Sequence, residues 1–167
     1  SEVSLFRVGD RVTPASMPIG AYSEKQVMPE DKLISVPDGI SDEVASCITL
    51  KGITAEYLLH RAYPLKKGDK VLYHAAAGAL GQILCPWANS LGAEVIGTVG
   101  SKAKEEIAKK NGCHHVINYS EKDFVKEVEK IVGKNGIDVV YDGVGTKTFK
   151  GSIETLKIRG MMVAFGN

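Results

Sequence analysis

The chain has 167 residues, with 21 Lys and Arg against 20 Asp and Glu, which gives a formal net charge of +1. This balance argues against a protein that binds nucleic acid by charge, because such proteins carry a basic excess on one face. Hydrophobic residues make up 44% and charged residues 25% of the chain, which excludes extended disorder, and no apolar run approaches the roughly 18 residues of a membrane span.

The first 37 residues are rich in proline: Pro14, Pro18, Pro29 and Pro37. Dense proline disfavours helices and allows short strands, here at Arg11-Val12 and from Ala21 to Val27. The chain does not begin with Met and stops just after an apolar run. We therefore interpret it as a piece of a longer protein, and residues 1–37 as the end of a β-rich unit whose beginning is missing.

Helical signals begin at Ser41, a suitable N-cap followed by two acidic residues, which the first turn of a helix favours. Lys51-Gly52 is expected to interrupt this helix. A second helix is expected from about Thr54 to Arg61, ended by Pro64.

From residue 68 onward, expected strands alternate with expected helices. The strands are Val71–His74, Glu94–Thr98, His115–Asn118, Ile137–Asp142 and Met161–Phe165. Near-continuous runs of Val, Ile and Leu are typical of strands buried on both faces, and hence of a parallel sheet. Right-handed crossovers then give the α/β class, a doubly wound parallel Rossmann sheet with five strands in residues 38–167.

The helices between these strands carry apolar stripes. The first places Leu80, Ile83, Leu84, Trp87 and Leu91 on one face. Another is expected from Ser101 to Asn111, a third has Phe124, Val125, Val128, Ile131 and Val132 inward, and the last contains Phe149, Ile153 and Leu156.

Pro86 lies inside the first of these helices. Proline removes the hydrogen bond to the carbonyl of Gln82 and should kink the helix. We interpret the segment as a kinked helix with its stripe preserved, and the alternative is a helix that stops at Cys85.

The cysteines Cys47, Cys85 and Cys113 are odd in number and widely spaced. They form no CxxC motif and cannot all pair within one chain, which favours free thiols in a reducing cytoplasm. The adjacent His114 and His115 would point to opposite faces of a strand, so we expect no metal site.

After the first strand of the sheet the chain reads Ala75-Ala76-Ala77-Gly78-Ala79-Leu80-Gly81, a variant of GxGxxG in which Ala76 replaces the first glycine. Gly78 lets the backbone approach a pyrophosphate, and Gly81 lets the helix pack closely on the sheet. The helix N-terminus offers unpaired N–H groups to phosphates. The motif alone also fits a tight turn with no ligand, but its place in the alternation favours dinucleotide binding. Ala76 has a Cβ, so this turn must use an allowed φ.

The second strand suggests which dinucleotide binds. An NAD site places an acid about 20 residues after the loop, at the end of that strand, but here the strand ends Gly97-Thr98-Val99-Gly100. Lys102 and Lys104 follow at a helix N-terminus, where cations are otherwise unfavourable. This favours NADPH over NADH, and the alternative for the lysines is a solvated helix face.

Glycines also follow the fourth and fifth strands, in Asp142-Gly143-Val144-Gly145 and Phe165-Gly166-Asn167. They would let the backbone approach the other end of the cofactor, whereas ordinary turn glycines are the alternative.

Several motifs occur together in a fixed order, which is more specific than any one of them. They are Gly9-Asp10-Arg11-Val12, Gly20-Ala21-Tyr22-Ser23-Glu24, Lys51-Gly52-Ile53-Thr54-Ala55, His74-Ala75-Ala76-Ala77-Gly78-Ala79-Leu80-Gly81, Gly97-Thr98-Val99-Gly100 and Asp142-Gly143-Val144-Gly145. With this set the sequence resembles, along essentially its whole length, the quinone oxidoreductase (zeta-crystallin-like) branch of the zinc-independent medium-chain dehydrogenase/reductase family.

The resemblance implies an NADPH-dependent reductase of quinones or related α,β-unsaturated carbonyls, with residues 1–37 as the tail of a GroES-like catalytic domain. It implies that Lys104 and Tyr119 hold the 2′-phosphate and that Thr54 lies near the nicotinamide half. Family members are often homodimers, paired through a strand that would follow Asn167. From the motifs and the resemblance together, the expected cofactor residues are Thr54, Ala76, Gly78, Ala79, Leu80, Gly81, Thr98, Lys104, Tyr119, Gly143, Val144, Phe165 and Gly166.

No side chain in this sequence is assigned as the catalytic group, and this part alone is expected to bind cofactor at best. One alternative is a methyltransferase that binds S-adenosylmethionine, although that site too would favour an acid at the end of the second strand. Another is a non-catalytic NADPH-binding or RNA-binding crystallin-like protein, and the near-zero net charge argues weakly against RNA.

Overall fold

The computed structural model describes residues 3–15 and 19–166. Its contacts divide the chain into two compact units, Ser1–Ile53 and Thr54–Asn167, and each is described by itself. Pro18 and Asn167, both named in the sequence analysis, lie outside the described residues.

The first unit contains a small antiparallel sheet of β1 (Val12–Pro14) and β2 (Leu33–Ser35), with a 3-10 turn at Glu30–Lys32 before β2. The strand expected at Val12 is confirmed. The strand expected from Ala21 to Val27 is wrong, because this segment has no regular secondary structure. A strand needs a hydrogen-bonded neighbour, and in this sheet β2 is the neighbour of β1.

Helix α1 (Asp42–Glu56) begins as the sequence predicts, since the backbone N–H of Val44 donates to the Ser41 hydroxyl at 3.3 Å. The expected interruption at Lys51-Gly52 is wrong, and α1 runs straight through it. A helical glycine costs only about 1 kcal/mol, which a helix of this length tolerates. The turns that follow, Tyr57–Ala62, widen into a π-helix.

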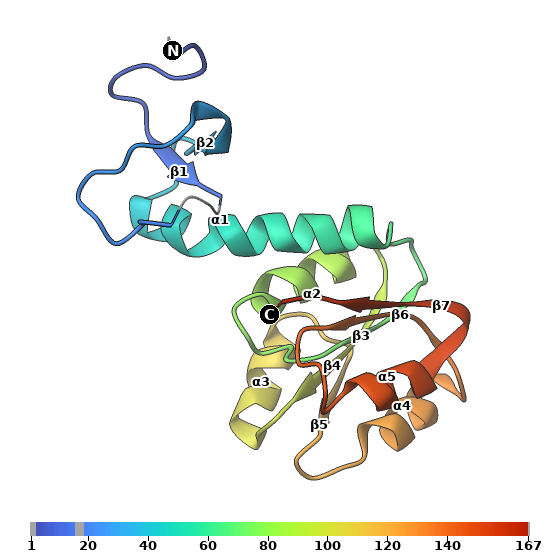
Figure 1. Cartoon of the computed structure of the whole chain (residues 1–167). Helices are drawn as coiled ribbons and strands as arrows, with labels where there is room; N and C mark the ends of the chain where they lie inside the picture. The colour runs from blue at the N-terminus through green and yellow to red at the C-terminus, as the bar shows by residue number, and fades with distance from the viewer. Residues whose placement is uncertain (1–2, 16–18, 167) are drawn as a thin grey trace. The chain divides into compact units, whose positions relative to one another are not determined.

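The second unit alternates strands and helices. In chain order they are β3 (Lys70–Tyr73), α2 (Gly81–Ser90), β4 (Glu94–Val99), α3 (Lys102–Lys110), β5 (His115–Asn118), α4 (Phe124–Val132), β6 (Ile137–Asp142), α5 (Phe149–Thr155) and β7 (Leu156–Ala164). The strands form one parallel sheet in the order β5-β4-β3-β6-β7 (Figure 1). The predicted α/β fold with a five-stranded parallel sheet is therefore confirmed.

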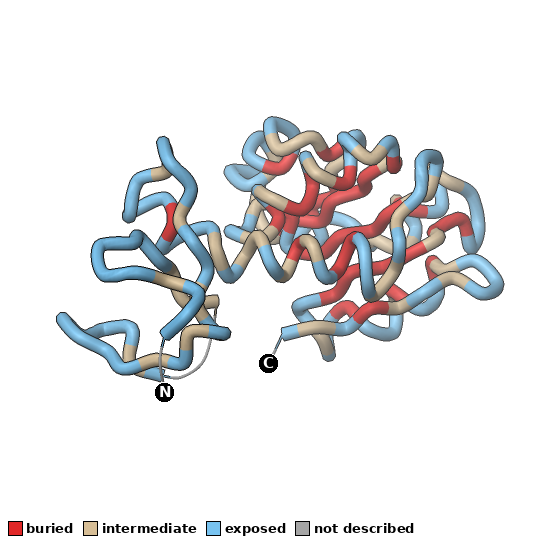
Figure 2. The backbone as a smooth tube through the Cα atoms, turned by 90° about the horizontal axis from the view of Figure 1, so that it is seen from above, coloured by how far each residue is buried: buried red, intermediate tan, exposed pale blue. Residues whose placement is uncertain are grey.

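Alternate side chains of the central strands enter two hydrophobic cores, one on each face of the sheet. Val71 and Val139 join the core under α2 and α3, whereas Leu72 and Val140 join the core under α4. Burial is concentrated on these strands (Figure 2). This explains the apolar runs in the sequence, because both faces of each central strand are covered.

Two details of the helices differ from expectation or choose between alternatives. Helix α2 continues through Pro86 to Ser90, so the alternative that it stops at Cys85 is wrong. Leu156 was expected on the last helix but begins β7, five residues before the expected start of that strand. The register of β7 against β6 shifts there, and Arg159 has a φ of +68°. This irregularity interrupts the alternation of apolar and polar residues from which a strand is predicted.

Among the described residues, no helix combines the length and the apolar character needed to cross a membrane.

Candidate cofactor-binding site

The carboxyl ends of the five parallel strands meet at one edge of the sheet. Chain segments leave β3 and β6 in opposite directions, and in such sheets ligands bind at this point of reversal. Twelve expected cofactor residues lie in or just after these strand ends: Ala76, Gly78, Ala79, Leu80, Gly81, Thr98, Lys104, Tyr119, Gly143, Val144, Phe165 and Gly166. Thr54 lies on α1 instead.

The loop after β3 is a tight backbone turn. The N–H of Ala76 donates to the carbonyl of Thr98 at 3.0 Å, and the N–H of Gly78 donates to the carbonyl of Ala75 at 2.8 Å. The left-handed backbone conformation lies on Ala75, with a φ of +61°, one residue before the alanine that replaces the first glycine. The loop therefore stores about 1 kcal/mol of strain at an alanine.

The two glycines of the loop differ in what surrounds them. A Cβ added to Gly81 would lie 2.7 Å from the carbonyl carbon and 2.9 Å from the Cα of Ala76. At Gly78 an added Cβ would meet only the carbonyl oxygen of Ala75, at 3.1 Å. Gly81 is thus required for the close approach of α2 to the backbone at Ala76, whereas a Cβ on Gly78 would be in tight contact with one backbone oxygen.

Helix α2 starts directly from this loop, with Leu80 as N-cap and no side chain capping its first turn. Bare backbone and an uncapped helix N-terminus suit a pyrophosphate, which needs N–H donors and no side chain in the way. The loop therefore fits the diphosphate of a dinucleotide.

The end of β4 carries no acid, as the sequence shows. Tyr119, which follows β5, reaches across to Gly100, and an added Cβ on Gly100 would lie 2.7 Å from the tyrosine hydroxyl. Lys109 pairs with Glu106 on α3, whereas neither Lys102 nor Lys104 has a carboxylate partner in the described part of the chain. The structure thus brings a hydroxyl to the end of β4 and leaves the lysines at the start of α3 unneutralised.

The ends of β6 and β7 are held together. The N–H of Phe165 donates to the carbonyl of Asp142 at 3.1 Å. The Phe165 ring lies against Gly143, where an added Cβ would be 3.0 Å from it, and stacks on Tyr73 with ring centroids 6.5 Å apart. Three expected cofactor residues, Gly143, Val144 and Phe165, therefore lie around one turn of backbone.

A cavity of about 350 Å³ joins two of the strand ends. It is lined by Tyr119, Lys122, Asp123, Phe124, Val144, Lys147 and Thr148. Because Tyr119 and Val144 are both expected cofactor residues, this cavity belongs to the candidate site.

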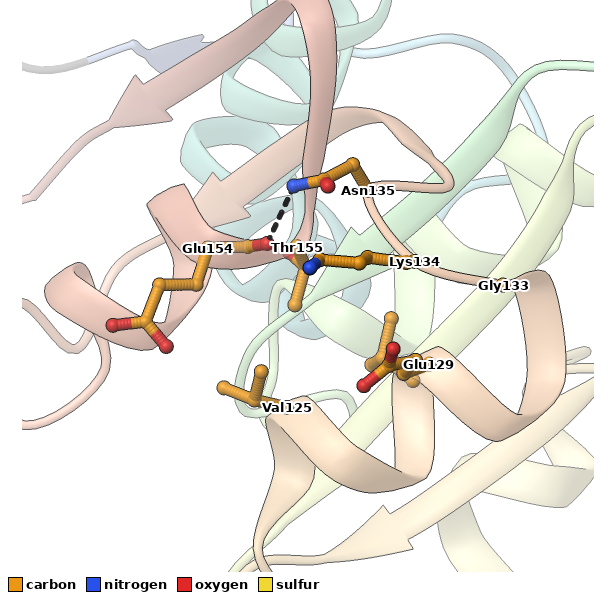
Figure 3. Close-up of a pocket in the computed structure, with 8 residues that line it drawn as sticks. Val125, Glu129, Gly133, Lys134, Asn135, Glu154 and Thr155 are labelled. Atoms are coloured by element: carbon orange, nitrogen blue, oxygen red, sulfur yellow. Dashed lines mark hydrogen bonds between the residues drawn. The ribbon is translucent and has the colours of Figure 1, made fainter.

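A second cavity, of about 320 Å³, lies between α4 and α5 (Figure 3). Glu129, Lys134 and Glu154 line it, and the Asn135 side chain donates to the carbonyl of Glu154 at 3.0 Å. None of the expected cofactor residues lines this cavity, so it is separate from the candidate site.

A buried polar network beneath the site was missed by the sequence analysis. His74 directly follows β3, and its Nδ1 lies 2.8 Å from the Thr98 hydroxyl while its Nε2 lies 2.9 Å from the Ser152 hydroxyl. The Ser152 hydroxyl donates to the carbonyl of Thr148 at 2.8 Å, so its oxygen accepts from Nε2–H and Thr98 donates to Nδ1. Burial lowers the pKa of His74 to about 4, which keeps the ring neutral.

Thr98 stays a predicted cofactor residue, and the structure shows that its side chain is fully buried and bonded to His74. Its carbonyl, which accepts from Ala76, is what reaches the glycine loop.

Asp142 holds the loop after β6. One carboxylate oxygen accepts from the N–H groups of Val144 at 2.8 Å and Gly145 at 2.9 Å, and the other accepts from the Thr148 hydroxyl at 2.7 Å. Burial acts to raise the pKa of Asp142, but the hydrogen bonds from Gly145, Thr148 and Val144 outweigh it and leave that pKa below its ordinary value. The carboxylate therefore fixes the backbone turn that carries Gly143 and Val144.

These residues do not form a hydrolytic triad. Asp142 bonds to hydroxyl and N–H groups, and Ser152, the hydroxyl next to His74, is fully buried. A nucleophile must be reachable by substrate and must face a base that is oriented by the acid. The network is structural support for the loops above it.

We expect Asp142→Asn to lower the free energy of unfolding by about 2 kcal/mol, because one accepting oxygen becomes an NH₂ group that faces N–H or O–H donors. Urea unfolding measures the change. Asp38→Asn is the matched control, since Asp38 is exposed in a turn, and it should change stability by less than about 0.5 kcal/mol. Equal effects at the two positions would contradict the structural role of Asp142.

In the described part of the chain, His, Cys, Asp and Glu nowhere gather in a group of three that could hold a metal ion.

Comparison with known proteins identifies relatives. The model of the zinc-binding dehydrogenase family matches residues 79–167. The 2-haloacrylate reductase of a Burkholderia species is 50% identical over 99% of the chain and 50% of that protein. A quinone oxidoreductase of Pseudomonas aeruginosa is 44% identical over the whole chain and 51% of that protein. The chain thus spans about half the length of the curated relatives it matches.

Solved structures agree with these matches. The crystal structure of Escherichia coli quinone oxidoreductase complexed with NADPH has a TM-score of 0.94 and 45% identity, covering 99% of this chain and 51% of that one. The structure of 2-haloacrylate reductase has a TM-score of 0.93 and 49% identity, covering 99% and 52%. The chain belongs to the zinc-binding dehydrogenase family, and within it to the zinc-independent quinone oxidoreductase branch of the medium-chain dehydrogenases/reductases.

Proposed function

We propose that the chain forms the NADPH-binding part of an oxidoreductase that passes hydride from NADPH to quinones or related α,β-unsaturated carbonyl compounds. One observation carries this proposal. The glycine loop after β3, at the point where the strand order reverses, lies beside the end of β4, and that end has no acid. Instead it has the Tyr119 hydroxyl and, at the start of α3, two lysines without a carboxylate partner among the described residues. Support comes from the E. coli relative, which was crystallised with NADPH, and from relatives named as reductases of quinones and of 2-haloacrylate.

Different residues around this edge of the sheet would bind different parts of the cofactor. The backbone N–H groups of Ala79, Leu80 and Gly81 would hold the pyrophosphate, which the missing side chain of Gly78 lets approach. Lys104 with Tyr119 would hold the 2′-phosphate. The turn at Gly143 and Val144, with Phe165 and Gly166, would approach the rest of the cofactor, and Thr54 its nicotinamide half. NADPH supplies the hydride, and the protein supplies position and electrostatics.

The remaining features of the whole protein belong to the same proposal. Residues 1–37 would be the tail of a GroES-like catalytic domain and residues 38–167 the cofactor domain. The substrate would be a small quinone or enone, and the whole protein a homodimer. Cys47, Cys85 and Cys113 are free thiols, which supports the reducing cytoplasm as its location.

The whole protein tests this function. Mixed with NADPH and 1,4-benzoquinone, it should oxidise NADPH at a rate that depends on the quinone concentration, and it should oxidise NADH more slowly. If NADPH binds but no quinone or enone accelerates its oxidation, the protein is a non-catalytic NADPH binder and the proposed reaction is wrong.

A further inference from the structure

Tyr119 occupies a place that one glycine leaves open. A Cβ added to Gly100 would lie 2.7 Å from the Tyr119 hydroxyl oxygen, 3.1 Å from Cζ and 3.4 Å from Cε2. The distance to the hydroxyl oxygen is too short for a real Cβ and the distance to Cζ is tight, so the hydroxyl can lie in this place at the end of β4 only because residue 100 has no side chain.

Hydrogen bonds fix the backbone that carries Tyr119. Its N–H donates to the carbonyl of Val99 at 3.0 Å, which continues the pairing of β5 with β4. The buried side chain of Asn118 accepts from the N–H and hydroxyl of Ser120, at 3.1 and 2.7 Å. Its amide group donates to Glu105 on α3 at 3.2 Å. The turn after β5 is therefore tied to the helix that carries Lys104.

Gly100 lies at the position where a dinucleotide-binding site distinguishes NADH from NADPH. A protein that binds NAD has a carboxylate at the end of the second strand, which accepts from the ribose hydroxyls. Here that place holds a phenolic hydroxyl, which can donate to a phosphate oxygen, and Glu105 bonds to Asn118. The exchange of an acceptor for a donor favours the cofactor with the extra phosphate.

We infer that Gly100 determines the preference for NADPH by leaving the space in which the Tyr119 hydroxyl lies. Gly100 is thus a positioning residue that acts through Tyr119. The inference rests on the proposed function and adds a residue whose own atoms need not touch the phosphate.

The geometry also says what an alanine at this position would do. The atoms in its way are the far end of a side chain that is 43% exposed and can rotate outward. The backbone need not shift, so Gly100→Ala should move the hydroxyl while leaving the fold intact. The thermal midpoint of the variant, measured by circular dichroism, checks this point.

A double-mutant cycle on the full chain tests the inference. The dissociation constants of NADPH and NADH are measured by calorimetry for the wild type, Gly100→Ala, Tyr119→Phe and the double variant. Tyr119→Phe should lower the preference for NADPH about tenfold, the effect of one hydrogen bond to a charged group. Gly100→Ala should lower it several-fold with NADH binding unchanged, and should have no further effect when residue 119 is phenylalanine.

Asn118→Ala is a second variant, which loosens the turn without adding an atom. It should lower the preference in the same way, and again only when the Tyr119 hydroxyl is present.

The inference is overturned if Gly100→Ala keeps the preference, weakens both cofactors equally, or acts as strongly in the Tyr119→Phe background. In each of these cases the wild type still prefers NADPH and the proposed function stands. If the wild type binds neither cofactor, or binds both equally, the proposed function fails first and the inference fails with it.

Discussion

Gly81→Val should lower the free energy of unfolding by about 3 kcal/mol and abolish NADPH binding. The added Cβ would lie within 3 Å of the Ala76 backbone, which cannot rotate away as a side chain can. The hydrogen bond from Ala76 N–H to the Thr98 carbonyl holds that backbone on β4. To relieve the contact, α2 must move off the sheet, and its N-terminus moves away from the place of the phosphates.

Gly52→Val is the matched control for this prediction. Gly52 is also a helical glycine, but an added Cβ there meets nothing within 4 Å. Its stability should stay within about 0.5 kcal/mol of the wild type. Urea unfolding compares the two variants, and similar losses at Gly81 and Gly52 would show that the close approach of α2 to β3 is not what the glycine provides.

Acid should destabilise the chain through His74. The pKa of His74 is about 4 in the folded protein, below its ordinary value of 6.5, because the ring is buried. Between these values the unfolded chain binds a proton that the folded chain does not, so stability falls as the pH is lowered from 6.5 towards 4. The loss should reach roughly 3 kcal/mol, since each pKa unit corresponds to about 1.4 kcal/mol.

The groups that contact His74 do not account for the loss of stability expected in this pH range. Thr98 and Ser152 do not titrate there, Phe124 packs its ring edge-on against the imidazole, and the pKa of Asp142 lies below the ordinary value of its carboxyl group. His74→Gln keeps a donor but cannot titrate in this range. Urea unfolding at pH 7 and pH 4.5 should show a smaller pH dependence for this variant, whereas equal pH dependence would contradict the assignment.

The sequence predicts the second unit well because its signals are local. Apolar runs gave β5 and β6 with their observed bounds, and the glycine loop was placed correctly between β3 and α2. The right-handed crossovers limit the strand orders that such an alternation can adopt.

The errors occur where a local signal was overruled. Gly52 does not stop α1, because its cost is small against the rest of the helix. Leu156 looked helical by spacing but begins β7, where a shift of register breaks the alternation. The segment from Ala21 to Val27 alternates in sequence but has no regular strand structure.

The sequence predicts the backbone features of the candidate site but not the side-chain contacts that support it. Glycines at strand ends and a missing acid can be read along the chain. The contact of Tyr119 with Gly100 joins two separate loops, and His74 meets Ser152 across 78 positions of sequence. Hydrogen bonds of this kind depend on which strands become neighbours, so they appear only once the sheet is built.

Calorimetric titration of the chain with NADPH and NADH tests the central claim most directly, when it is repeated on Lys104→Glu and on Lys110→Glu, a control with the same charge change at the other end of α3. The wild type and Lys110→Glu should bind NADPH at least about tenfold more tightly than NADH, and Lys104→Glu should lose that preference, because a carboxylate then faces the 2′-phosphate. A wild type without preference, or a preference that survives Lys104→Glu, would contradict the account.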